Sequence, residues 1–100
     1  MNYIETIAHQ IREQLPGDAV PDDDAQPLLL LYALLALTKG ERVSARDVHD
    51  AWSTWMTIRG EDDHDSVVEF DSLSRGTKHL DDPYVRAIRH VAQTLSPQGD

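Results

Sequence analysis

The chain has 100 residues, of which 40% are hydrophobic, and a formal net charge of −9 at pH 7. This length corresponds to one domain, and the apolar content is sufficient for a hydrophobic core. The absence of cysteine excludes disulfide bonds and zinc sites built on thiolates. The charge disfavours direct binding to nucleic acids or anionic membranes, because both require an excess of Lys and Arg.

The first predicted helix spans about residues 2–15. Asn2 can cap it, and Glu5 follows at the position of the reciprocal partner in a capping box. A proline and a glycine end this amphipathic segment, and residues 16–24, with two prolines and four aspartates, predict a linker. Three of these aspartates precede the next helix, where the helix dipole favours negative charge.

The second predicted helix, over about residues 25–39, is the most apolar part of the chain. Every residue from Leu28 to Leu37 is apolar or tyrosine, a run too short for a bilayer span of about 20 residues. A helix that is apolar all round is typically buried, so we expect a central core helix that Gly40 closes. The alternative is that one leucine face is exposed and forms a homodimer.

The third predicted helix, over about residues 44–59, carries both tryptophans. Ser44 and Asp47 have the spacing of a capping box, and Gly60 is a left-handed stop. We interpret the tryptophans as core residues, with the alternative that one ring borders a ligand pocket. His49 lies one turn before Trp52. We interpret it as a surface or hydrogen-bonded residue, with contact to a ligand as the less favoured alternative.

An acidic loop around His64 follows, at residues 61–65. Its acids lack the alternating spacing and central glycine of a calcium loop, so a solvated loop is expected and no metal site. Apolar side chains then attach an irregular segment to the core, and the polar run 74–80 is predicted to be a loop. The attaching residues are Val67, Val68, Phe70 and Leu73.

The last predicted helix spans about residues 82–95. Pro83 suits its first position, with Asp81 or Asp82 as the cap and Tyr84 on the buried face. The outward face holds Arg86, Arg89 and His90. The fold class is therefore all-α: a compact single-domain bundle of about four helices, residues 1–100, with an irregular loop segment before the last helix.

A distinctive order of motifs fills the second half of the chain. His49-Asp50-Ala51-Trp52 lies on a predicted helix, the helix ends at Gly60, and the run from His64 to Leu73 follows. Over about residues 43–95 this order resembles the ryanodine-receptor repeat (RyR) domain. The whole chain also resembles small proteins of actinobacteria and their phages that have no assigned function. The first resemblance implies an accessory module that senses or sequesters a small ligand such as a nucleotide.

No phosphate loop, metalloprotease motif or nucleophile elbow is present, so we expect a non-enzymatic binding module without a cofactor. The resemblance and the aromatic clustering place a pocket between the tryptophan helix and the loop after it. The candidate ligand-binding residues are His49, Trp52, His64, Phe70 and Tyr84, with positive charge from Arg86 or Arg89.

The acidic surface supports a second hypothesis, a phage- or bacteria-encoded protein-interaction module. It would inhibit a host protein or mimic DNA, and the mimic requires carboxylates from 18–24, 61–65 and 81–82 in one continuous stripe. A dimeric structural protein is a further alternative. The expected partner is therefore an unknown small ligand or protein, without direct contact to nucleic acid or membrane. We expect a cytoplasmic location, because no signal peptide opens the chain.

Overall fold

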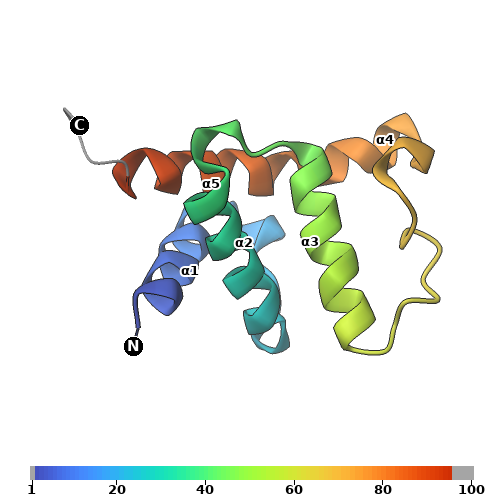
Figure 1. Cartoon of the computed structure of the whole chain (residues 1–100), viewed down its shortest axis with the longest axis horizontal. Helices are drawn as coiled ribbons and strands as arrows, with labels where there is room; N and C mark the ends of the chain where they lie inside the picture. The colour runs from blue at the N-terminus through green and yellow to red at the C-terminus, as the bar shows by residue number, and fades with distance from the viewer. Residues whose placement is uncertain (1, 96–100) are drawn as a thin grey trace.

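The computed structural model describes residues 2–95, with the exception of the Asp23 side chain. Four helices of at least twelve residues form the fold (Figure 1): α1 (Tyr3–Gln14), α2 (Gln26–Thr38), α3 (Ala45–Ile58) and α5 (Asp82–Leu95). Shorter helical turns connect them: η1 (Gly17–Ala19), η2 (Asp23–Ala25), η3 (Gly40–Arg42), η4 (Phe70–Ser72), α4 (Arg75–Lys78) and η5 (His79–Asp81). No strand occurs within residues 2–95, so the all-α prediction is confirmed.

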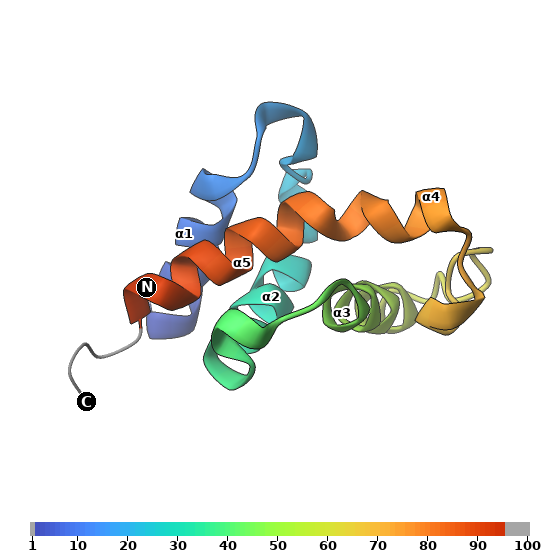
Figure 2. The ribbon, with the colours of Figure 1, turned by 90° about the horizontal axis from the view of Figure 1, so that it is seen from above.

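The long helices form two layers. In Figure 1, α1, α2 and α3 lie side by side, and α5 runs across their upper ends. Seen from above in Figure 2, α5 follows the long axis of the molecule and continues directly from α4. α2 and α5 each contact the other three long helices, and the core lies between the two layers.

The helix ends follow the local signals in the sequence. The Glu5 N–H donates to Asn2 Oδ1 at 2.9 Å, and the Asn2 N–H donates to Glu5 Oε1 at 3.0 Å. Ser44 and Asp47 form the equivalent reciprocal pair at the start of α3. Gly60 has a φ of 78°, which an L side chain rarely adopts, and it ends α3 as predicted.

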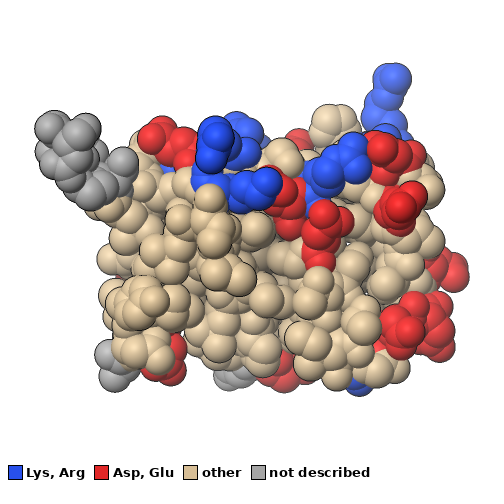
Figure 3. Space-filling model, in the orientation of Figure 1, with Lys and Arg blue, Asp and Glu red and all other residues tan. Residues whose placement is uncertain are grey.

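The prediction that α2 is a central core helix packed on both sides is confirmed, because α2 lies between α1 and α3 and also contacts α5. Its burial is incomplete. Leu29 and Ala33 are fully buried, but Leu34 and Leu37 are 49% and 44% exposed. The neighbouring helices cover only part of the circumference of α2, and these two leucines, one turn apart, lie on the uncovered part. Figure 3 shows a broad area without charged side chains over this layer. The alternative of an exposed leucine face fits the structure, while dimerisation through it stays a prediction.

A second difference concerns residues 74–81, which form α4 and η5 instead of a loop. The Thr77 N–H donates to Ser74 Oγ at 3.2 Å, so Ser74 caps this helical turn. Asp82 has helical φ and ψ of −55° and −43° and is not a cap, because η5 runs into α5 without an extended residue. This continuous path holds Asp81 against α3. Within residues 2–95, no helix combines the length and apolar character needed to cross a membrane.

Candidate functional site

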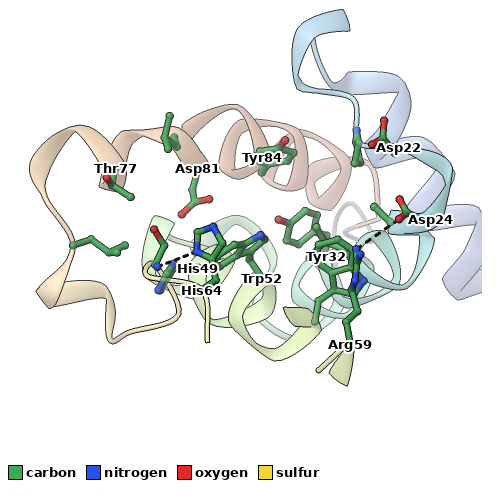
Figure 4. Close-up of a pocket in the computed structure, with 17 residues that line it drawn as sticks. Asp22, Asp24, Tyr32, His49, Trp52, Arg59, His64, Thr77, Asp81 and Tyr84 are labelled. Atoms are coloured by element: carbon green, nitrogen blue, oxygen red, sulfur yellow. Dashed lines mark hydrogen bonds and ion pairs between the residues drawn. The ribbon is translucent and has the colours of Figure 1, made fainter. Parts of the chain in front are cut away.

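A cleft of about 640 Å³ is lined by residues from several helices. It lies between α2, α3 and α5 and is bordered by the segments before α2 and α5 (Figure 4). Its volume is within the range of small-molecule sites, about 300–1,000 Å³. Six rings line it: Tyr32, His49, Trp52, Trp55, His64 and Tyr84. Its charged lining residues are Asp22, Asp24, Asp81 and Arg59.

The rings of the cleft contact one another at specific angles. Trp52 stacks on His49 with ring centroids 5.8 Å apart, and the ring of His64 meets it edge-on at 5.3 Å. Tyr32 and Tyr84 pack at 5.5 Å with their planes tilted by 42°. α3 and the loop after it therefore supply one group of rings, and α2 and α5 supply the other (Figure 4).

His49 anchors the segment that follows α3, residues 61–69 (the acidic loop segment), to this helix. Its side chain is 3% exposed, and Nε2 donates to the Val68 carbonyl oxygen at 2.6 Å, because a carbonyl can only accept. This geometry confirms the interpretation of His49 as a hydrogen-bonded residue. It also leaves Nδ1 as the unprotonated nitrogen of the neutral ring.

Asp81 is half-buried and points toward His49 in Figure 4. It has no hydrogen bond or ion pair with any described residue. Burial is the main cause that raises the pKa of the Asp81 carboxyl from 3.8 to about 6; His49 opposes this shift and nearby Asp82 contributes to it. The cleft therefore contains a carboxylate that no cation of the chain neutralises.

Tyr32 brings a second unsatisfied group to the cleft. The residue is 1% exposed, and its hydroxyl has no hydrogen-bond partner in the described part of the chain. Burial, and then the charge of Asp81, raise the pKa of this phenol. The neighbouring Tyr84 hydroxyl, by contrast, donates to the Ala19 carbonyl oxygen at 2.8 Å.

Arg59 is the cation at the edge of the cleft, and it is already paired. Its guanidinium lies 4.4 Å from the Trp55 ring centroid, 2.6 Å from Glu61 and 3.7 Å from Asp24. The lining thus carries three carboxylates and one guanidinium. No group of three or more His, Asp or Glu within residues 2–95 could hold a metal ion.

The structure brings together four of the seven residues selected from the sequence: His49, Trp52, His64 and Tyr84. Phe70 lies in an adjacent hollow of about 300 Å³, between Arg46 and Lys78, each 5.3 Å from its ring centroid.

The two arginines proposed to supply positive charge do not line the cleft. Arg86 is exposed, and Arg89 Nε donates to the Val43 carbonyl oxygen at 2.9 Å. Arg59 takes the role assigned to them, because the end of α3 brings it beside η2.

Sequence reasoning missed Tyr32, Asp81 and Arg59 as cleft residues. The available signal for Tyr32 was that it alone carries a polar group within the run from Leu28 to Leu37. Asp81 carried no such signal, because its position depends on α4 and η5.

Fold and cleft together define a small all-α domain with an aromatic-walled cavity that is rich in carboxylates. A family described as a domain of unknown function (DUF7701) matches residues 2–93, and the chain belongs to this family. No curated protein and no solved structure matches the chain.

Proposed function

We propose that the domain is a non-enzymatic module that binds a small organic ligand with a flat ring in this cleft. The observation that carries the proposal is the combination of aromatic walls with two unsatisfied polar groups, Asp81 and Tyr32. Ring faces bind a planar ligand by stacking, and a few polar groups fix its orientation. Neither group has a hydrogen-bond partner among the described residues, so a ligand that pairs with both gains hydrogen bonds that the chain does not supply.

The charges of the lining determine which part of a nucleotide the cleft would accept. Asp22, Asp24 and Asp81 would repel phosphate, and Arg59 is already shared between Asp24 and Glu61. A nucleotide would therefore insert its base and leave its phosphates outside. A nucleoside or another phosphate-free ring compound fits the lining better than a polyanion.

The hydrogen bonds of the two cleft histidines give both rings a structural role beside the cleft. His49 donates to the Val68 carbonyl oxygen, and His64 Nδ1 accepts from the Ser66 N–H at 3.0 Å. Each imidazole is thus used to hold the acidic loop segment in place.

A thermal-shift screen against nucleosides, nucleotides and small aromatic metabolites tests this proposal. A ligand that binds only the folded state raises the melting temperature by mass action. We expect Trp52→Ala and His64→Ala to abolish the shift, and His64 is exposed, so its variant retains the fold. Leu34→Ala is the matched control on the far surface of α2. No shift with any compound, or a shift that both cleft variants retain, would refute the proposal.

The exposed leucines of α2 favour a second candidate function, a protein-interaction module or a homodimer. Leu34 and Leu37 lie one turn apart and are 49% and 44% exposed. Figure 3 shows a broad area without charged side chains over the layer of α1, α2 and α3. An exposed apolar area of this kind is typical of protein contact surfaces. Light scattering at increasing concentration tests the dimer, and Leu34→Gln with Leu37→Gln should abolish any association. A constant monomer mass would leave only a different protein as the partner.

A further inference from the structure

We propose that the cleft selects organic cations, namely ligands with a protonated amine or amidine beside an aromatic ring. This inference rests on the proposed function and specifies the ligand class for the same site. It follows from three features of the lining: a carboxylate and a hydroxyl that have no partner among the described residues, and ring faces beside them.

The carboxylate of Asp81 is the first feature. Figure 4 shows it directed toward His49, within the cleft. The ionisable groups around it are His49 of α3, Tyr32 of α2, and Asp82 and Tyr84 of α5. None of these supplies a permanent positive charge. The raised pKa of Asp81 is what a carboxylate shows when burial is not compensated by a cation. A ligand ammonium would provide this missing charge.

The hydroxyl of Tyr32 is the second and independent feature. The residue is 1% exposed, yet the hydroxyl is unpaired within residues 2–95 and reaches the cleft in Figure 4. An ammonium carries up to three N–H donors. A single ammonium placed between the two groups would pair with the Asp81 carboxylate through one donor and with the Tyr32 hydroxyl oxygen through another.

The rings are the third feature. The negative face of an indole or phenol attracts a cation, and the attraction increases when water is excluded. The chain already contains this arrangement at the edge of the cleft, where Arg59 lies 4.4 Å from the ring centroid of Trp55. Trp52 and Tyr84 add further aromatic rings to the lining.

The charges that attract a cationic ligand to the cleft repel an anionic one. Asp22, Asp24 and Asp81 line the cleft, and the one guanidinium there is bound to Asp24 and Glu61. The negative charge of the ligand is repelled by these carboxylates. The half-buried position of Asp81 reduces the screening of this repulsion by solvent. The lining therefore discriminates by charge among ligands that have the same ring.

Three probes with one ring and different charges test the inference by calorimetry at pH 7.5: tryptamine, tryptophol and indole-3-propionate. They carry a positive, a neutral and a negative group on an indole. We expect tryptamine to bind at least about tenfold more tightly than tryptophol, because a charge-assisted hydrogen bond contributes about 1.5–3 kcal/mol. Indole-3-propionate should bind most weakly.

Two substitutions identify the groups responsible. Asp81→Asn keeps the shape of the side chain and should make tryptamine and tryptophol bind equally. Tyr32→Phe should lower tryptamine affinity about tenfold by removing one hydrogen bond. Asp63→Asn is the matched control, because this exposed carboxylate does not line the cleft, and it should retain the preference. Circular dichroism confirms that each variant is folded.

The outcomes separate this inference from the proposed function. If tryptophol or indole-3-propionate binds as tightly as tryptamine, the cation selectivity is overturned while a ring-binding cleft stands. The same holds if Asp81→Asn keeps the preference for tryptamine. If none of the three indoles binds and the thermal-shift screen gives no shift, both the inference and the proposed function are overturned.

Discussion

Tyr32 and Tyr84 offer a matched test of how the cleft is built. Their rings pack at 5.5 Å, but their hydroxyls are in opposite situations. Tyr84 donates to the Ala19 carbonyl oxygen at 2.8 Å, whereas Tyr32 has no partner within residues 2–95. Phenylalanine lacks only the oxygen, so Tyr32→Phe and Tyr84→Phe each isolate one hydroxyl.

The two substitutions should change the free energy of unfolding in different directions. Tyr84→Phe removes a hydrogen bond with a net contribution of about 0.5–1.5 kcal/mol. For a domain of this size, a loss of about 1 kcal/mol lowers Tm by about 4–8 °C. Tyr32→Phe removes a hydroxyl that is hydrated in the unfolded chain and unpaired in the folded one. The free energy of unfolding of the Tyr32→Phe variant should equal that of the wild type or exceed it by up to about 1 kcal/mol.

Urea and thermal unfolding at pH 7, followed by far-ultraviolet circular dichroism, measure both effects. The wild type and the two variants are compared under identical conditions, with the denaturant slope m as a check that the unfolded states are alike. A loss above about 1 kcal/mol in Tyr32→Phe would mean that its hydroxyl has a stabilising partner. That result would refute the assignment of Tyr32 as an unsatisfied cleft group.

Four further predictions concern stability. The raised pKa of Asp81 favours the folded state in acid, and this contribution is lost as the pH rises through about 6. Asp81→Asn should lack this loss and, after allowance for solvent screening, be more stable than the wild type at pH 7 by about 1 kcal/mol. Melting curves of the variant and the wild type that coincide from pH 4 to 7 would contradict this. Leu29→Ala should destabilise by about 2–5 kcal/mol in urea, because Leu29 is fully buried, and a smaller loss would indicate that the core collapses around it. His49→Ala should lose about 1–3 kcal/mol and speed hydrogen exchange in residues 61–69, and unchanged exchange there would show that the bond to Val68 is dispensable. Gly60→Ala should cost about 1–2 kcal/mol at its φ of 78°, and a neutral melting curve would contradict the left-handed stop.

The long helices were predictable because their signals are local. Asn2 with Glu5, and Ser44 with Asp47, form the reciprocal caps that their spacing predicts. Each pair acts within one helical turn, so no tertiary information is needed to recognise it. The predicted ends of all four long helices lie within one residue of the observed ends, as a result of such caps and stops.

Residues 74–81 were not predictable in the same way. Their sequence has no apolar residue at helical spacing, and a glycine at position 76 disfavours a helix. The turn forms because Ser74 caps it and because α5 extends it from the other end. The exposure of Leu34 likewise depends on which neighbours cover α2, and this is a property of the packed structure.

The cleft combines both cases. His49 and Trp52 lie one turn apart on a helix, so their proximity follows from helical spacing. Tyr32 and Asp81 are separated by 49 positions along the chain and meet only after α2, α3 and η5 pack. Aromatic residues could therefore be identified as candidates from the sequence. The carboxylate, the hydroxyl and the guanidinium of the site required the fold.

Both tryptophans of the chain line the cleft, so their fluorescence should report ligand binding there. Trp55 lies beneath Arg59, and Trp52 contacts two imidazoles, so the two indoles emit from different surroundings. Tryptophan fluorescence therefore originates beside the cavity and needs no label. A non-fluorescent ligand that enters should change the intensity or the emission maximum, while binding on the leucine surface of α2 should leave the spectrum unchanged.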